Sequence, residues 1–408
     1  MEDYIDEELS ILEKNGSSFD KKWLLGIKKQ ALAGCYNLDQ TIDEILIEIC
    51  EGTIDFINSG VVSGLSTGIY LDDNPYNFTI YGGHCYYDKK DKIDEDTLFD
   101  IASITKLFTL LLTFKLEELG YLNLDTIISK YNFDFKLGDF TIDDLVKMFG
   151  VIRTDKRIDE CKNKEEAYQV LKEIKIVDTK KGKPHYTDMG MIVLSSTIEK
   201  IVSEKKHQKL SFDEIMDMYL LQPLGLNNTT FKPHNNIAGT GNKLIIPNDQ
   251  KAQILGPIGS AGLFSNSHDL SKLFNKLYHS GYLNDYHLNK LNQKLRFNSS
   301  RGYAGINLKH PEGIIKSFAP NEYSDKVYAE QGWTGCVVIN DPLNKIHNNF
   351  LVSSIKENER KKPNDFMKYY NDYQLLVVRK TLTLLLLKKI YNKYYNCNEK
   401  KEKVIKLS

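Results

Sequence analysis

The pattern of apolar and polar positions predicts strands towards both ends of the chain and helices between them. Residues 41–58 carry isoleucine or leucine at positions i, i+3, i+4 and i+7, which is the spacing of one helix face. Short runs rich in β-branched and aromatic residues, bounded by turn residues, are typical of strands. The predicted strands cover residues 61–70, 77–87, 333–339 and 348–354.

Helical periodicity dominates the middle of the chain and its last part. The predicted helices of the middle cover residues 104–119, 141–149, 164–174, 188–203 and 211–221. A long helix is also predicted from 365 to 406. Its last stretch is rich in lysine, which favours a solvated tail over a segment that lies on a membrane surface.

This order of elements predicts the fold class. Strands on both sides of a helical stretch favour one antiparallel sheet flanked by helices, with an all-helical subdomain inserted at about 104–255. The predicted class is therefore α/β in content, of the α+β type. We divide the chain into an N-terminal extension over 1–40, a main domain over 41–360, and a C-terminal helix with a basic tail over 361–408.

Composition and charge exclude several classes of protein. A chain of 408 residues that is 41% hydrophobic can bury a full core in one large domain. A net charge of -1 argues against nucleic acid as a partner. The six scattered cysteines show no zinc-binding spacing and predict free thiols in a reducing compartment. An acidic start and the shortness of the apolar stretches predict no signal peptide and no transmembrane segment, hence a cytoplasmic protein.

Candidate chemistry begins at Ser103 and Lys106, which stand three residues apart at the head of an apolar run. On a helix this spacing places both groups on one face, where the ammonium can polarise the hydroxyl and share its proton. The same spacing recurs at Ser18, Ser203 and Ser353. The alternative interpretation is therefore a serine that caps a helix, followed by a surface lysine.

Two later segments separate Ser103 from the other matches. Tyr186-Thr187-Asp188 opens a predicted helix, and residues 331–336 read Gln-Gly-Trp-Thr-Gly-Cys before a predicted strand. In order and spacing, S-x-x-K, Y-x-N/D and x-T-G resemble the motifs of the family of class C beta-lactamases, DD-peptidases and related esterases. Other segments also resemble that family, and they extend the likeness to roughly 55–356: 96–103, 120–125, 222–226 and 259–265.

The resemblance implies a beta-lactamase/transpeptidase-like fold and a role for each motif residue. Ser103 would attack an acyl carbonyl, Lys106 would polarise its hydroxyl, and Tyr186 would accept and return the proton. The backbone N–H groups of Ser103 and Cys336 would stabilise the oxyanion. The residues expected to contact substrate are Asp188, Trp333, Thr334 and Gly335.

Each of the substrate-contacting residues has a more specific expectation. Asp188 can accept a hydrogen bond from Lys106 and hold the ammonium in place. Thr334 is expected to turn its hydroxyl towards the substrate, and Gly335 lets the strand approach it closely. The partner is a small-molecule ester or amide. No metal or organic cofactor is implied, because serine acylation requires neither.

Trp333 departs from the family pattern. Beta-lactamases of this type usually have lysine at this place, and some peptidases and esterases have histidine. A cation there can bind the carboxylate of a beta-lactam or of a peptide C-terminus. Indole offers one neutral N–H and a large apolar face, so it cannot replace that charge. The sequence therefore predicts weak beta-lactamase activity and a preference for uncharged esters.

Three alternatives remain at this stage. Gly64-Leu65-Ser66-Thr67-Gly68 matches the G-x-S-x-G elbow of α/β hydrolases, but that elbow must lead from strand to helix and here the strand pattern continues. The chain could be a D-amino-acid peptidase or beta-lactamase. It could also be an inactive relative that binds a ligand in the same groove, although such a relative is expected to have lost one of the motif residues.

Overall fold

The computed structural model describes thirteen segments, which are 41–71, 76–86, 90–132, 134–178, 184–234, 236–239, 247–291, 293, 302–303, 305–307, 323–353, 363–395 and 401–407. The predicted extension over 1–40 lies outside the described residues. Among the described residues, no helix has both the length and the apolar character needed to cross a membrane.

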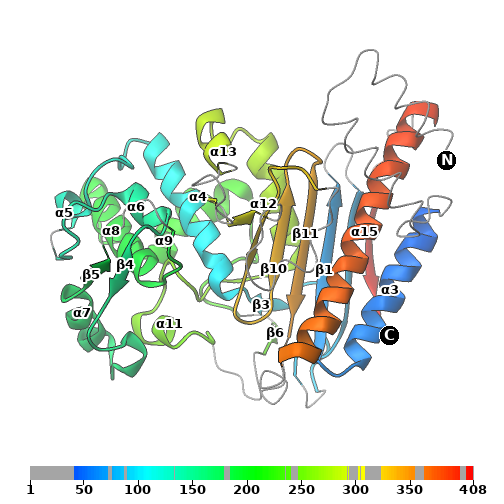
Figure 1. Ribbon diagram of the computed structural model, residues 1–408, viewed down its shortest axis with the longest axis horizontal. Coiled ribbons are helices and arrows are strands. Elements are labelled where there is room, and N and C mark those ends of the chain that lie inside the picture. Colours follow the sequence, from blue (N-terminus) through cyan, green and yellow to red (C-terminus); the bar gives the residue numbers. More distant parts are fainter. Residues whose placement is uncertain are drawn as a thin grey trace.

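A seven-stranded sheet forms the body of the molecule (Figure 1). Its order is β12-β2-β1-β11-β10-β9-β8. The strands are β1 (Gly64–Leu71), β2 (Tyr76–Gly83), β8 (Ile306–Asn307), β9 (Tyr328–Gln331), β10 (Val337–Asp341), β11 (Ile346–Val352) and β12 (Lys401–Lys406). β1 pairs antiparallel with β11, so N- and C-terminal segments share one sheet, as the sequence predicts.

The end of the chain corrects one prediction. The long C-terminal helix α15 (Pro363–Tyr395) does not continue to 406. Instead, β12 pairs in parallel with β2 at the edge of the sheet, and Val404 lies opposite Thr79. The basic tail is therefore an edge strand, whose lysine side chains suit the solvated border of a sheet.

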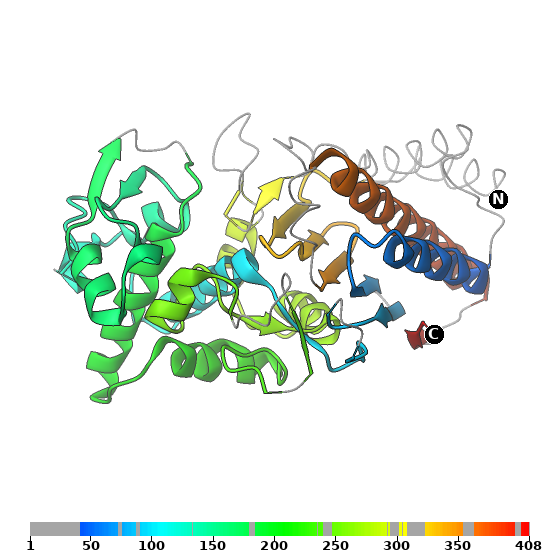
Figure 2. The ribbon, with the colours of Figure 1, turned by 90° about the horizontal axis from the view of Figure 1, so that it is seen from below.

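Helices cover both faces of the sheet. On one face α3 (Ile42–Asn58) and α15 lie side by side, which is seen in both views (Figure 2). The helix predicted from apolar spacing is confirmed in α3, where Ile45 and Ile49 are fully buried. Thr41 and Glu44 form a capping box at its start. On the other face α12 (Ser267–His279) packs against β1 and β11.

The helical part of the molecule lies beyond the sheet, on the left of Figure 1. Its central helix is α4 (Thr105–Glu118), which is buried on nearly all sides. Around it lie further helices: α5 (Ile128–Tyr131), α6 (Ile142–Val146), α7 (Lys164–Lys172), α8 (Met189–Lys206), α9 (Phe212–Met216), α10 (Gln222–Leu224), α11 (Gln250–Leu255) and α13 (Asp285–Leu291).

This part is not all-helical, contrary to prediction. β4 (Val151–Arg153) and β5 (Lys175–Asp178) form a two-stranded antiparallel sheet within it. Each strand is short and has too few residues to show a period of two over several repeats, which explains why the pattern did not reveal it. A second small sheet has the order β6-β3-β7, from Ile237–Ala238, Leu98–Asp100 and Phe264–Ser265.

Candidate active site

The nucleophile candidate lies where β3 leads into α4. A short 3-10 turn, Ala102–Ile104, joins the two elements and carries Ser103 to the N-terminal end of the buried helix. Ala102 has a φ of 45°, in a left-handed region that alanine seldom adopts. The carboxylate of Asp100 accepts the Ala102 N–H at 2.8 Å and the Asn248 N–H at 2.8 Å. Asp100 thus holds the turn that presents Ser103.

Lys106 lies against Ser103, as the S-x-x-K spacing predicts. Its Nζ donates to Ser103 Oγ at 2.8 Å and to the Ser260 carbonyl at 2.9 Å. It also forms an ion pair with Asp188 Oδ1 at 2.9 Å, and its side chain is only 2% exposed. Burial disfavours the charged form, but Tyr186 and Asp188 outweigh this and raise the pKa of Lys106. The group is therefore an ammonium, which polarises Ser103 but cannot take its proton.

Tyr186 contacts the same serine oxygen from another part of the chain. Its hydroxyl lies 2.7 Å from Ser103 Oγ. Lys106 Nζ lies 4.9 Å from the centre of the Tyr186 ring, so a positive charge faces the phenol. The ring is 49% exposed, which leaves room for a substrate beside it. Ser103 and Lys106 come from one part of the sequence and Tyr186 from another, and the three side chains meet at the Ser103 oxygen.

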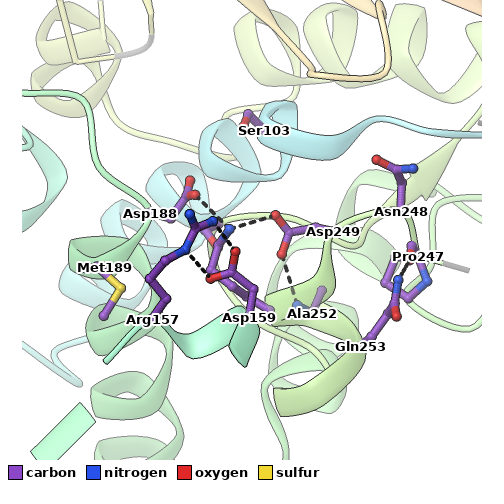
Figure 3. A network of polar contacts seen from close by, with 12 residues as sticks. Ser103, Arg157, Asp159, Asp188, Met189, Pro247, Asn248, Asp249, Ala252 and Gln253 are labelled. Carbon is purple, nitrogen blue, oxygen red and sulfur yellow. Dashed lines mark hydrogen bonds and ion pairs between the residues drawn. The ribbon is translucent and has the colours of Figure 1, made fainter. Parts of the chain in front are cut away.

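Behind the lysine, Asp188 lies between two cations. Lys106 contacts its Oδ1, and Lys251 contacts its Oδ2 at 3.3 Å. Burial alone would raise the pKa of Asp188, but the two ammonium groups outweigh burial and lower it. Lys251 also pairs with Asp249 at 3.1 Å, the residue that caps α11. Figure 3 shows these carboxylates together below Ser103, next to the Arg157–Asp159 ion pair.

The turn between β9 and β10 forms the opposite wall. It closes through hydrogen bonds from the Gly332 N–H to the Cys336 carbonyl at 2.7 Å and from the Gly335 N–H to the Gly332 carbonyl at 3.0 Å. A Cβ on Gly332 would lie 2.6 Å from the Ile101 carbonyl oxygen. The turn can therefore lie directly against the segment before Ser103 only because this residue is glycine. The predicted strand over 333–339 begins only at Val337.

Thr334 and Trp333, which both lie in this turn, differ in how far their side chains are exposed. Thr334 is 1% exposed, and its hydroxyl donates to the Asp100 carbonyl at 2.7 Å. The prediction of a substrate-facing hydroxyl was wrong, because this hydroxyl ties the turn to β3 instead. Trp333 is 72% exposed, and its neighbours in sequence both contact the segment 100–102. Its side chain is thus available at the rim of the site.

The thiol of Cys336 is not placed to act as a nucleophile. The side chain is buried, and its Sγ lies 3.6 Å from the Asp100 carbonyl. Burial raises the pKa of the thiol to about 12, so the thiolate needed for nucleophilic attack is scarce near neutral pH. The oxyanion role of its backbone N–H stays a prediction, in a turn whose Gly332 lies against Ile101 and Ala102.

Sequence reasoning missed three residues that build the site. Asp100 and Ser260 lie in segments that resemble the family, but only the structure shows that they contact the Ala102 N–H and the Lys106 ammonium. Lys251 follows a stretch without any motif. The sequence held one indication of Lys251. A half-buried carboxylate such as Asp188, beside Lys106, is stabilised by a second cation, so a further lysine could be expected near it.

Asp100 gives a prediction about stability and pH. Burial raises the pKa of its carboxyl from 3.8 to about 6, despite the two N–H groups that it accepts. As pH rises, the unfolded chain loses this proton at a lower pH than the folded protein does. The contribution of Asp100 to the free energy of unfolding therefore falls between about pH 4 and pH 6, by on the order of 3 kcal/mol. Asp100→Asn removes the titration.

We therefore expect the stability of D100N relative to wild type to improve on going from pH 4 to pH 7. Urea unfolding of both proteins at the two pH values measures the difference. An equal difference at both values would contradict the raised pKa of Asp100.

Comparison with known proteins agrees with this geometry. The profile of the Beta-lactamase family matches residues 38–366. The chain belongs to the Beta-lactamase family. Members of this family with the beta-lactamase fold are serine hydrolases, among them esterases, peptidases and beta-lactamases.

The similar proteins in sequence carry different names. A putative D-alanyl-D-alanine carboxypeptidase of Escherichia coli (strain K12) is 26% identical over 341 residues, which cover 70% of this chain and 76% of that protein. The Beta-lactamase-like protein 4 of Dictyostelium discoideum is 27% identical over 240 residues, which cover 52% of this chain and 42% of that protein.

The solved structures that are similar to this chain in fold also carry different names. EstCE1, a hydrolase with promiscuous acyltransferase activity, has a TM-score of 0.63 at 17% identity, covering 82% of this chain and 99% of its own. A class C beta-lactamase has a TM-score of 0.64 at 17% identity, covering 83% of this chain and 99% of its own. These similarities confirm the predicted fold class.

Proposed function

We propose that this protein is a serine hydrolase that acts on esters or small amides through an acyl-enzyme on Ser103. One observation carries the proposal: Ser103 Oγ lies within hydrogen-bonding distance of both the Lys106 ammonium and the Tyr186 hydroxyl, at 2.8 and 2.7 Å. A nucleophile, a buried cation and a proton acceptor in mutual contact are what acyl transfer to serine requires.

The reaction follows from this geometry in two halves. Tyr186 acts as the base and takes the proton of Ser103 while Oγ bonds to the substrate carbonyl carbon. The carbonyl oxygen becomes an oxyanion, which the N–H groups of Ser103 and Cys336 stabilise. The bond to the leaving alcohol or amine then breaks, and Tyr186 protonates it. Water attacks the resulting ester by the same steps, releases the acid and restores Ser103.

The rim of the site supports a preference for uncharged acyl groups. The exposed indole of Trp333 stands where a cation would bind a substrate carboxylate. The charges nearest the nucleophile are already balanced, because Asp188 lies between Lys106 and Lys251, and Lys251 also pairs with Asp249. An apolar acyl chain can instead cover the indole face.

The substrate class has a direct test. We expect kcat/KM for p-nitrophenyl butyrate to exceed kcat/KM for nitrocefin by at least about tenfold, the order of a missing charge-assisted hydrogen bond. Trp333→Lys is expected to lower the ratio of ester to nitrocefin kcat/KM, because it restores a cation. Trp333→Phe stays apolar and is expected to leave this ratio unchanged. If wild-type protein turns over nitrocefin faster than the ester, the assignment of the substrate class is wrong.

A second candidate is a D-amino-acid peptidase. The relative in Escherichia coli that is named a putative D-alanyl-D-alanine carboxypeptidase supports it, as does the exposed Arg157 beside the carboxylates of Figure 3, since a guanidinium suits a peptide C-terminus. Release of D-alanine from a D-alanyl-D-alanine peptide at a kcat/KM above that of the ester would favour the peptidase over the esterase.

A further inference from the structure

A tyrosine from the far side of the sheet reaches the wall of the site. Tyr370 lies on α15, on the face that α15 shares with α3. Its hydroxyl donates a hydrogen bond to the Gly335 carbonyl oxygen. The Tyr370 side chain is buried, and its ring stacks on Phe56 of α3 with centroids 5.6 Å apart. The tyrosine is therefore held on both sides and can fix the group that it contacts.

The group that Tyr370 contacts is one half of a single peptide unit. The Gly335 carbonyl and the Cys336 N–H share a planar peptide bond, so they point in opposite directions. Fixing the carbonyl towards Tyr370 fixes the Cys336 N–H away from α15, towards the side from which the turn meets the Ser103 segment. A hydrogen bond to the carbonyl also polarises the N–H of the same unit and makes it a better donor.

The backbone at this place needs such a partner. Gly335 has a φ of 100°, a conformation open to glycine and costly for other residues. Glycine rotates more freely than any other residue, so the orientation of the following N–H is not set by its own backbone. The Gly335 N–H is held by the Gly332 carbonyl at 3.0 Å, whereas its carbonyl is held from the other layer of the molecule.

We propose that Tyr370 is a positioning residue for the oxyanion site, acting through the Gly335–Cys336 peptide. This rests on the proposed function, in which the Cys336 N–H stabilises the oxyanion. Burial raises the pKa of Tyr370 well above its usual value, so the phenol remains a neutral donor over the working pH range. The C-terminal helix, which carries none of the motif residues, is then part of the catalytic apparatus.

The test compares Tyr370→Phe with Tyr373→Phe. Tyr373 is a matched control on the same helix, because it is also buried and also stacks on Phe56, with centroids 5.0 Å apart. Its hydroxyl contacts Thr53 at 3.0 Å and Thr67 at 2.8 Å, away from the turn. Each substitution removes one hydroxyl and keeps the ring.

We expect Y370F to lower kcat for p-nitrophenyl butyrate by roughly tenfold or more, with KM nearly unchanged. Loss of a whole oxyanion donor costs about 100- to 1,000-fold, and loss of its orientation should cost less. Inhibition by butylboronic acid, which forms a tetrahedral adduct on serine, should weaken by a similar factor. Y373F should stay within about twofold of wild type in both measurements. All rates are taken where circular dichroism shows each protein fully folded.

Two results would overturn this role. One is a Y370F protein whose kcat and boronate affinity match those of Y373F. The other is a fall in kcat without a change in boronate affinity, which indicates that the oxyanion site is intact and that Tyr370 acts elsewhere. If Y370F does not fold, Tyr370→Met removes the same hydroxyl and is judged by the same criteria. Failure of the proposed function is distinct, since wild-type hydrolysis would then not depend on Ser103.

Discussion

Replacement of Ser103 with alanine is expected to lower kcat/KM for p-nitrophenyl butyrate by at least about a hundredfold, because no acyl-enzyme can form without its oxygen. The remaining groups still polarise a carbonyl and orient water, so a residual rate above the buffer is expected. Because Ser103 is small and lies at the start of a well-buried helix, S103A should fold normally. Initial rates over a range of ester concentrations measure the effect.

Ser203→Ala is the matched control for this experiment. Ser203 also begins an S-x-x-K sequence, with Lys206, but its Oγ accepts the Leu210 N–H at 3.0 Å and stabilises a loop. Its loss should leave the rate within about twofold of wild type. A fluorophosphonate that labels wild type but not S103A would identify the nucleophile independently. Equal rates for wild type and S103A would indicate a binding protein or a different nucleophile.

These two serines show what the sequence could and could not reveal. Their local patterns are the same, and only the order of three distant motifs favoured Ser103. The structure explains why that order matters, since Tyr186 and Asp188, just before α8, reach Ser103 and Lys106 respectively. Motif order thus carried long-range information that no local pattern contained, and it predicted correctly that Ser103, Lys106 and Tyr186 are neighbours.

Predictions failed where a long-range contact determines the outcome. Thr334 sits in a motif that suggests substrate contact, yet its hydroxyl finds the Asp100 carbonyl, which is distant in sequence. The predicted C-terminal helix was extended over residues 401–406, but these residues pair with β2 at the edge of the sheet. The contact that Tyr370 makes could not be predicted from the sequence, because its partner is a backbone carbonyl, and every residue has one.

The second large effect concerns Lys106. Lys106→Met keeps the length and apolar stem of the side chain but removes the ammonium that contacts Ser103 and Asp188. We expect kcat/KM for the ester to fall by about a hundredfold or more, since the ammonium that polarises the Ser103 hydroxyl is then missing. Asp188 keeps Lys251 as a partner, so K106M should remain folded, though less stable.

The rate of the folded protein distinguishes a chemical role for Lys106 from a structural one. Methionine cannot carry the ammonium charge, so the loss of kcat/KM should persist in K106M where circular dichroism shows the protein fully folded. Lys206→Met is the control. The Lys206 Nζ lies 5.9 Å from the centre of the Tyr219 ring, on a helix surface away from Ser103. A K106M protein that is fully folded and as active as K206M would show that Lys106 supports the structure of the site without taking part in the chemistry.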